Sequence, residues 1–230
     1  MNETLKKVLQ YCILPLVIVA LVIVIVKGVQ KPVKFDKEKE FRTKEAVQRL
    51  KDIRDLQVAY KSVNGKFSST IDSLILFYNT GKMDVVLQVG SKDDSIAVVN
   101  TERIKKANKK ITQEELYELY KKGERVIATV KTQFAVKDTL FVNRTNFVVD
   151  SIKYIPYSGG QLVEMESIVK KVSGVDVPLF EARMPYRALL KGMDNQLRIN
   201  LDDERKTMNQ YEGLMVGSIN NPNNNAGNWE

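Results

Sequence analysis

The carboxylates are the residues of this chain whose types could perform chemistry most directly. Asp202, Asp203 and Glu204 form the densest acidic cluster, and Glu164 and Glu166 are two residues apart, which puts them on one face of a strand. A pair of carboxylates at a suitable separation can cleave a glycosidic bond. Acidic clusters and polar strand faces are far more often simply solvated, so we expect no active site at either position.

The residue inventory removes most other catalytic chemistry. The 230 residues contain no histidine and one cysteine, Cys12. This excludes His-based acid–base catalysis, Ser-His-Asp and Cys-His nucleophiles, His-ligated metals and a disulfide framework. The chain has neither a G-x-G-x-x-G pattern nor a Walker loop. We therefore expect a protein that is not an enzyme and that uses no cofactor or metal.

An apolar run near the N-terminus must position everything that follows it. Residues 11–26 carry no charge, and the apolar pattern reaches residue 29 past Lys27. About twenty helical residues cross the hydrocarbon core of roughly 30 Å, provided that Lys27 extends its amine to the headgroups. The run has no small-residue cleavage site. We predict a retained transmembrane anchor with its flanks over residues 1–34, not a signal peptide.

The basic residues around this run leave its direction open. Two lysines precede the run and five follow it: Lys6, Lys7, Lys27, Lys31, Lys34, Lys37 and Lys39. The positive-inside rule is weak for a large domain behind a signal anchor. We predict a single-pass membrane protein whose large domain follows the span, and the charges do not fix the side on which that domain lies. The lysine pairs at 105–106 and 109–110 have no interleaved aromatic residues, so we expect a solvated face and no nucleic-acid partner.

A long amphipathic helix is predicted from Phe35 to about Val63. Its apolar stripe follows helical spacing and consists of Ala46, Leu50, Ile53, Leu56 and Tyr60. Asn64-Gly65 should end it, and only Pro32 separates it from the anchor, so the two should be nearly collinear. Leu50, Ile53 and Leu56 are our candidates for contact with a partner. They are core residues instead if the helix folds onto its own domain.

Local signals predict a helical and hairpin region next. Ser69 or Thr70 caps a helix that ends at Gly81, with Ile71, Leu74, Ile75 and Tyr78 as its apolar stripe. Asp84–Val89 and Ser95–Asn100 are predicted to form a β-hairpin. Thr112 and Glu115 form a capping box for a third helix, which ends at Gly123 and buries Leu116, Leu119 and Tyr120.

The C-terminal half is predicted to be rich in antiparallel β-structure. The predicted strands are Arg125–Val136, Thr139–Val142, Asn146–Ile155, Gln161–Val172 and Val175–Ala182, and a short helix follows Pro185 through Leu190. The fold class is therefore α+β, with an extracytoplasmic domain over residues 35–219 and a sub-boundary near residue 124. Residues 220–230 are predicted to be a flexible tail. Trp229, the only tryptophan, makes this tail either a docking peptide or a plain disordered end.

A motif follows the long helix. Ala59-Tyr60-Lys61 precedes Asn64-Gly65-Lys66-Phe67-Ser68, and the short helix Ile71–Tyr78 comes next. With the anchor, this pattern resembles the N-terminal half of type IV pilins and pseudopilins. The chain departs from them in lacking the prepilin-peptidase site and the glutamate at the fifth position of the mature helix, and Ser68 stands where proline is usual. The resemblance implies a subunit of a secretion or assembly complex that does not polymerise.

A second sequence pattern bears on the cellular compartment of the protein. Four Asp-[Ser/Thr]-aliphatic tripeptides occur, with Ser73, Ser95, Thr139 and Ser151 as their hydroxyl residues. They match the tripeptide that Bacteroidota O-glycosylate on exported proteins, and turn and cap chemistry is the alternative. The whole chain, especially its ending from Asn200 to Glu230, also resembles single-span proteins of Bacteroidota. That resemblance implies an envelope location and no particular activity. On this basis we predict a single-pass protein of the bacterial inner membrane with its C-terminal domain in the periplasm.

Three hypotheses of function follow from the sequence. The first is a non-enzymatic structural or accessory subunit of a bacterial envelope complex, with the membrane and other envelope proteins as its partners in a hetero-oligomer. The second is a membrane-tethered hydrolase that uses carboxylates, or a glycan- or lipid-binding domain. The third is an accessory subunit of a proton-driven membrane motor. Because the centre of the apolar run carries no ionisable group, this chain would not itself conduct protons.

Overall fold

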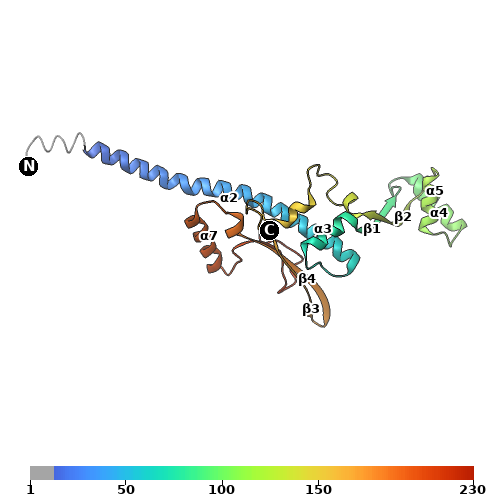
Figure 1. The fold of residues 1–230 in the computed structure, drawn as a ribbon. Coiled ribbons are helices and arrows are strands. Elements are labelled where there is room, and N and C mark those ends of the chain that lie inside the picture. Colours follow the sequence, from blue (N-terminus) through green and yellow to red (C-terminus); the bar gives the residue numbers. More distant parts are fainter. Residues whose placement is uncertain (1–12) are drawn as a thin grey trace, which may run out of the picture. The chain divides into compact units, whose positions relative to one another are not determined.

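The computed structural model describes residues 13–230 (Figure 1). The start of the apolar run, with Lys6, Lys7 and Cys12, lies outside the described residues. The fold is mixed α+β, with antiparallel sheets. It divides into two compact units: the chain up to Arg54 with Asp150–Glu230 is unit 1, and Asp55–Val149 is unit 2. The sequence instead predicted one domain with a sub-boundary near residue 124.

The helix α2 (Leu14–Asn64) contains both the apolar run and the amphipathic segment, which confirms that the two are collinear. Pro32 lies inside it. A proline removes the hydrogen bond to the carbonyl four residues earlier, here that of Gly28, without ending the helix. Among the described residues, α2 is the one helix long and apolar enough to cross a membrane. Gly65, with φ of +72°, ends it and donates its amide to the Lys61 carbonyl at 2.8 Å.

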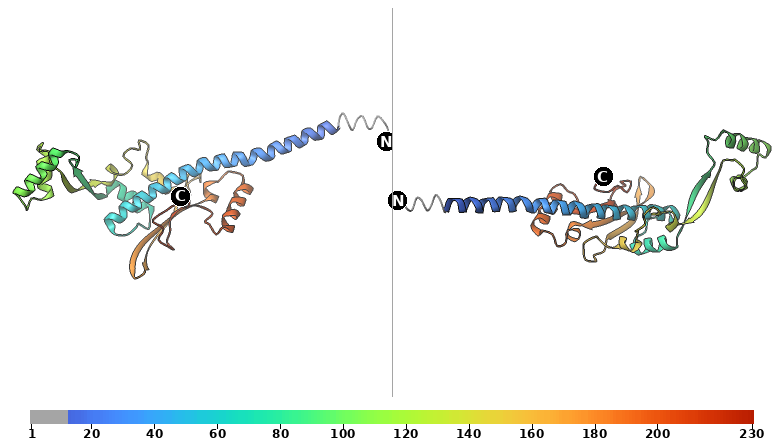
Figure 2. Two further views of the ribbon diagram at one scale, coloured as in Figure 1. Left: turned by 180° about the vertical axis from the view of Figure 1, so that it is seen from behind. Right: turned by 90° about the horizontal axis from the view of Figure 1, so that it is seen from above.

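The two halves of α2 have opposite environments. The described apolar side chains before Phe35 are exposed, from 44% at Val17 to 70% at Leu16. From Phe35 onward the helix has a buried stripe, made of Ala46, Leu50, Ile53, Leu56 and Ala59. Figures 1 and 2 show the beginning of α2, drawn in dark blue, with no other element of unit 1 beside it.

Unit 1 is built on a three-stranded antiparallel sheet in the order β3-β4-β5. Its strands are β3 (Glu164–Val172), β4 (Val175–Pro185) and β5 (Gly213–Gly217). Ser173 and Gly174 join β3 to β4 with positive φ at both positions, as a two-residue hairpin turn requires. The helices α6 (Tyr186–Leu189) and α7 (Asn195–Thr207) lead from β4 to β5. The predicted strands Gln161–Val172 and Val175–Ala182, and the short helix after Pro185, are confirmed.

Polar side chains of α2 attach it to the C-terminal part of unit 1. Arg42 Nη1 donates to the carbonyls of Leu189 and Lys191, at 3.2 and 2.9 Å. The Arg49 guanidinium donates to the Tyr154 carbonyl at 2.6 Å. These bonds join segments more than 100 residues apart in sequence. They hold α2 up to Arg54 against the rest of unit 1. The buried apolar residues of that unit include Ala46, Leu50 and Ile53 of α2 together with Ile152, Leu179, Phe180, Ala182, Met184, Leu189, Leu190, Leu214 and Val216.

Unit 2 contains a two-stranded ribbon with helices before, within and after it. The elements are α3 (Ile71–Thr80), β1 (Lys82–Val89), α4 (Ser95–Ala107), α5 (Gln113–Lys121), β2 (Ala128–Ala135) and η2 (Val136–Asp138). β1 pairs antiparallel with β2, from Lys82 opposite Ala135 to Val89 opposite Ala128. A small core of Val89, Leu116 and Ala128 lies where the ribbon meets α5.

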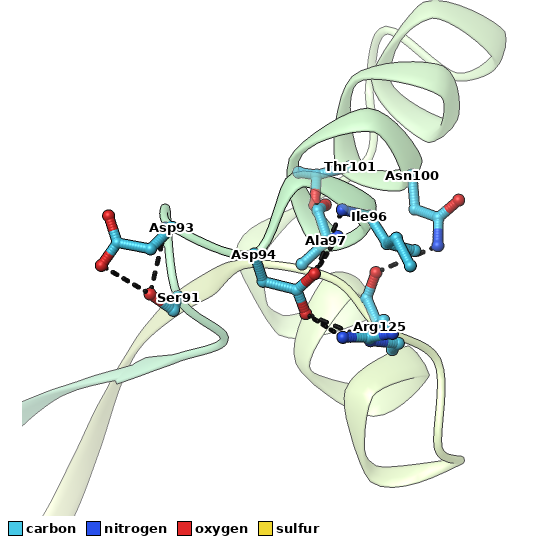
Figure 3. A network of polar contacts seen from close by, with 8 residues as sticks. All are labelled: Ser91, Asp93, Asp94, Ile96, Ala97, Asn100, Thr101 and Arg125. Atoms are coloured by element: carbon cyan, nitrogen blue, oxygen red, sulfur yellow. Dashed lines mark hydrogen bonds and ion pairs between the residues drawn. The ribbon is translucent and has the colours of Figure 1, made fainter.

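The predicted hairpin of Asp84–Val89 with Ser95–Asn100 is wrong in its second strand. Residues 95–100 belong to α4, and β1 pairs with β2 instead. The reason is the N-cap, drawn in Figure 3: Asp94 Oδ1 accepts from the amides of Ile96 and Ala97 at 3.1 and 3.3 Å. The Asp94 carboxylate also accepts from Arg125 Nε at 3.1 Å, which fastens α4 to the segment leading into β2.

Two further hydrogen bonds hold α4. Thr101 Oγ1 accepts from the Ile127 amide at 2.8 Å. Asn100 donates to the Arg125 carbonyl at 3.2 Å, a bond that Figure 3 also draws. Desolvation raises the pKa of Asp94, but the hydrogen bonds from Ala97 and Arg125 outweigh it and hold the pKa below its usual value.

Two other predicted strands are also wrong. Thr139–Val142 and Asn146–Ile155 form turns and the 3-10 helix η3 (Val149–Lys153). Phe141 has a positive φ of 62°, which is incompatible with an extended strand, and its ring lies 4.2 Å from that of Phe147.

The helix α7 and the strand β5 were not predicted. The capping box of Thr112 and Glu115 is confirmed, and Leu116 is fully buried, but Tyr120 is 42% exposed rather than buried.

The last residues pair with β5, in contrast to the predicted flexible tail over residues 220–230. Gly227 forms a β-bridge with Val216, and the Asn228 amide donates to the Met215 carbonyl at 3.0 Å. Glu230 pairs with Arg54 at 2.6 Å. Trp229 covers Gly227 so closely that a Cβ there would lie 2.4 Å from its ring. The tail is thus part of unit 1.

The burial of the α2 stripe gives a stability prediction with a matched control. Leu56→Ala removes a fully buried side chain, and we expect it to lower the free energy of unfolding by about 2–5 kcal/mol. Leu76→Ala, in α3 of the same unit, removes a side chain that is 63% exposed and should cost less than about 0.5 kcal/mol. Urea unfolding of the full chain in detergent, followed by circular dichroism, measures both. Equal losses would contradict this assignment of Leu56 to the core.

Candidate functional site

The structure places the predicted partner-contact residues inside the fold. Leu50, Ile53 and Leu56 are each 0% exposed, as the alternative interpretation of the sequence allowed. They are therefore not available as a docking surface. Trp229 is half-buried over Gly227, so it is not the free end of a docking peptide. A surface that contacts a partner must therefore consist of other residues.

The four candidate glycosylation residues all lie at or next to helical segments. Ser73 is in the first turn of α3, where its amide donates to Thr70 Oγ1 at 3.3 Å, and Ser95 is the exposed first residue of α4. Thr139 follows η2 and donates to the Ala135 carbonyl at 3.1 Å, and Ser151 is within η3. Capping and turn chemistry therefore accounts for these positions, and their modification stays a prediction.

The acidic residues divide between solvent and a cavity. Asp203, Glu204 and Glu166 are exposed. Asp202 is 9% exposed, and with Glu164 it lines a cavity of about 400 Å³ in unit 1. We call this cavity the charged pocket; its lining residues are Glu164, Pro185, Arg187, Arg198, Asp202, Tyr211 and Glu212.

The pocket lies where four segments of unit 1 meet. Glu164 begins β3, opposite Arg183 of β4 in the register of the sheet. Pro185 ends β4 and precedes α6, while Arg198 and Asp202 are one turn apart on α7. Tyr211 and Glu212 lie between α7 and β5. The Glu212 carbonyl accepts from the Tyr186 amide at 3.0 Å, which fixes this connection against the start of α6.

Opposite charges alternate around the pocket. Arg198 pairs with Asp202 at 2.5 Å, four residues apart on α7. Glu164 lies 3.5 Å from Arg183 and 3.9 Å from Arg187. Because these last two ion pairs are long and partly exposed, each contributes little to stability. Their side chains remain available to exchange a protein partner for a ligand.

Asp202 is the group in the pocket with the most unusual environment. Burial raises its pKa, and the nearby charge of Arg198 does not offset that effect. Its Oδ2 atom pairs with Arg198, whereas its Oδ1 atom is buried without a hydrogen-bond partner in the described part of the chain. A buried acceptor without a donor is costly, and a ligand hydroxyl or amine would satisfy it.

Tyr211 complements this acid. Burial and the neighbouring charge of Glu164 raise its pKa to about 12, so its hydroxyl is neutral at physiological pH. The pocket thus combines guanidinium donors, carboxylate acceptors and one neutral hydroxyl. This set suits a polar organic ligand that carries both donors and acceptors. The described residues offer no group of three or more potential ligands for a metal ion.

Sequence reasoning found Glu164 and Asp202 but missed the other charged residues of the pocket. Arg187 lies in the short helix α6, and Tyr211 and Glu212 lie in the connection between α7 and β5, so no local pattern joins them to Glu164 or Asp202. Arg198 could have been found, because its spacing of four from Asp202 places the two side chains together on any helix. The helix itself was not predicted, so that signal was not used.

The comparisons with known proteins add no relative. No protein-family model, curated protein or solved structure matches the chain. The resemblances to pseudopilins and to single-span proteins of Bacteroidota therefore stay hypotheses from the sequence.

The environment of Asp202 gives a prediction about stability and pH. Because the folded protein raises the pKa of this carboxyl, ionising it costs folding free energy as the pH rises through that range. We expect Asp202→Asn to raise the melting temperature of the full chain at pH 7, with a smaller gain at about pH 4, where the carboxyl of the wild type is partly protonated in both states.

Asp203→Asn is the matched control, because it makes the same change at the exposed neighbouring position of α7. It should leave the melting temperature unchanged. A lower melting temperature for Asp202→Asn at pH 7 would show that the ion pair with Arg198 outweighs the cost of burial, contrary to our assignment.

Proposed function

We propose that this protein is a non-enzymatic, single-pass membrane protein that acts as a structural or accessory subunit of a bacterial envelope complex. In this proposal the apolar half of α2 spans the inner membrane, and the rest of the chain lies in the periplasm. The complex would be a pseudopilin-like secretion or assembly complex with other envelope proteins as partners.

The observation that carries the proposal is the change of environment along α2. Residues 14–26 are apolar without exception, and their described side chains are exposed, which is strongly unfavourable in water and favourable in lipid. Its second half is packed into the protein core from Phe35 onward. One uninterrupted helix therefore joins a segment suited to lipid directly to a folded unit, with no linker between them. A continuous helix of this kind holds unit 1 at a fixed distance from the bilayer, which suits a subunit with a structural role.

The long helix also fits the pseudopilin resemblance. Gly65 ends α2, and α3 begins after a cap by Thr70, whose side chain accepts from the Ser73 amide. This is the order of elements that the motif around Asn64-Gly65 predicts. The likeness is one of arrangement along the chain, and it supports an assembly role without implying polymerisation.

A partner surface is available on α4 of unit 2. Ile96 and Val99 are 52% and 62% exposed, and their spacing of three places them on one side of the helix. Asp94 and Thr101 hold this helix in place, so the two side chains are presented by a fixed element. We propose that this side of α4, rather than the buried stripe of α2, contacts another subunit.

The charged pocket favours a second candidate function, a membrane-tethered domain that binds a glycan or another polar ligand. The specific observation is Asp202, whose buried Oδ1 atom lacks a donor. This candidate is compatible with the first, since an envelope subunit can hold a ligand. A carboxylate-based hydrolase would need a second acid at a defined separation across the same pocket.

The membrane orientation can be tested with a single cysteine. Lys92→Cys, in a chain whose Cys12 is replaced by serine, introduces a thiol on an exposed loop of unit 2. We expect a maleimide that cannot cross membranes to label it in cells with a permeabilised outer membrane. Labelling only after the inner membrane is lysed would place this unit in the cytoplasm and contradict the proposed topology.

The partner surface can be tested by affinity purification of the tagged full chain in mild detergent. We expect partner proteins in fixed proportion, and we expect Ile96→Ser with Val99→Ser to reduce them at least fivefold. The control pair Val169→Ser with Val175→Ser changes residues of similar exposure, 58% and 64%, in the β3–β4 hairpin of unit 1 and should have no effect. Recovery of the wild-type chain alone would contradict the subunit hypothesis.

A further inference from the structure

A second cavity of unit 1 lies beside the C-terminal end of the apolar run. It has a volume of about 240 Å³ and is lined by Lys31, Lys34, Phe35, Glu38, Met193 and Asp194. The first four residues belong to α2, and the last two belong to the connection between α6 and α7. We call it the juxtamembrane pocket. Phe35 and Met193 supply its apolar walls, and the other four residues supply two positive and two negative charges.

The pocket has the height of the lipid headgroups if α2 spans a bilayer. Val29 is the last residue of the apolar run, and Lys34 lies five residues further, about 7.5 Å along a helix. The headgroup layer of each leaflet is roughly 5–8 Å thick. Lys31 and Lys34 therefore lie in that layer, with the cavity between α2 and the α6–α7 connection open beside them.

The charges of the pocket are incompletely paired. Lys31 and Lys34 are exposed, and neither forms an ion pair with a described residue. Glu38 uses Oε1 to pair with Arg42 at 2.7 Å, and Asp194 uses Oδ1 to cap α7. Within the described part of the chain, the second oxygen of each carboxylate has no hydrogen-bond donor. The pocket thus offers two free cations and two carboxylate oxygens side by side.

We infer that the juxtamembrane pocket binds the headgroup of a zwitterionic phospholipid with a primary amine, of the phosphatidylethanolamine class. The lysines pair with the phosphate, and Glu38 and Asp194 accept from the ammonium, while Phe35 and Met193 contact the glycerol region. This inference rests on the proposed membrane span of α2.

The charge pattern separates this headgroup from the other common ones. A purely anionic headgroup would satisfy the lysines but would place negative charge beside two carboxylates. A choline headgroup has the same net charge as ethanolamine, but its ammonium carries no N–H group and cannot donate to those oxygens. Of the ethanolamine, choline and glycerol headgroups, ethanolamine alone brings both a phosphate for the lysines and an N–H donor for the carboxylates.

The test is native mass spectrometry of the full chain in detergent with equimolar phosphatidylethanolamine, phosphatidylcholine and phosphatidylglycerol. We expect the ethanolamine lipid to be retained about fivefold to tenfold more than either other lipid, the ratio that one charge-assisted hydrogen bond supplies. Retention in the order of net negative charge, or equal retention of the ethanolamine and choline lipids, would overturn the inference.

Two matched pairs of variants locate the site. Lys34→Gln should reduce retention of the ethanolamine lipid about fivefold, and Lys37→Gln, one turn further along α2 and outside the pocket, should not. Glu38→Gln should remove the preference over choline, whereas Glu40→Gln, which changes an exposed residue paired with Lys44, should preserve it. Equal effects within either pair would overturn the assignment to this pocket.

Flotation of the full chain with phosphatidylcholine vesicles separates this inference from the function on which it rests. Protein that does not float with vesicles lacks the membrane span, and the proposed function then fails together with the lipid site. Protein that floats but retains no ethanolamine lipid preferentially overturns the lipid site alone.

Discussion

The burial of one face of α2 is the constraint on which the rest of the structure depends. The same helix that exposes its apolar N-terminal half supplies Ala46, Leu50 and Ile53 to the core of unit 1 and Leu56 and Ala59 to that of unit 2. Arg42 and Arg49 fix its rotation by donating to backbone carbonyls of distant segments. A shift of one residue would turn the stripe by about 100° and lose both the burial and these bonds. The register of the helix thereby sets which of its residues reach the juxtamembrane pocket.

The two pockets of unit 1 differ in how their charges relate to stability. In the charged pocket, Asp202 is buried beside Arg198 but keeps an unsatisfied oxygen, so the folded state carries a cost there. In the juxtamembrane pocket the two lysines are exposed, and leaving them without an ion pair costs little in water. A cost retained in the folded state is a stronger sign of function than exposed charge, because surface charges need no ligand to be stable.

Features specified by neighbouring residues were predictable from the sequence, and features specified by distant contacts were not. Gly65 and the capping box of Thr112 and Glu115 act within one helical turn, and the structure has both. The strand Asp84–Val89 was found from its alternation, but its partner was not, because Asp94 suits a turn and an N-cap equally well. β5 is only five residues long and is defined by pairing with β4. The charged pocket likewise combines four segments, of which only the acidic residues stood out in the sequence.

Unit 1 is made of the two ends of the chain, and this arrangement imposes an order on its biogenesis. Residues up to Arg54 have no partners until Asp150–Glu230 have been synthesised, whereas unit 2 is one continuous stretch that can fold earlier. The two parts of unit 1 also meet at the ion pair between Arg54 and Glu230. Until Asp150–Glu230 have been made, the part of α2 that enters the core of unit 1 is an exposed amphipathic helix. Unit 1 therefore cannot form before residues 150–230 have been made and have reached the segment that ends at Arg54.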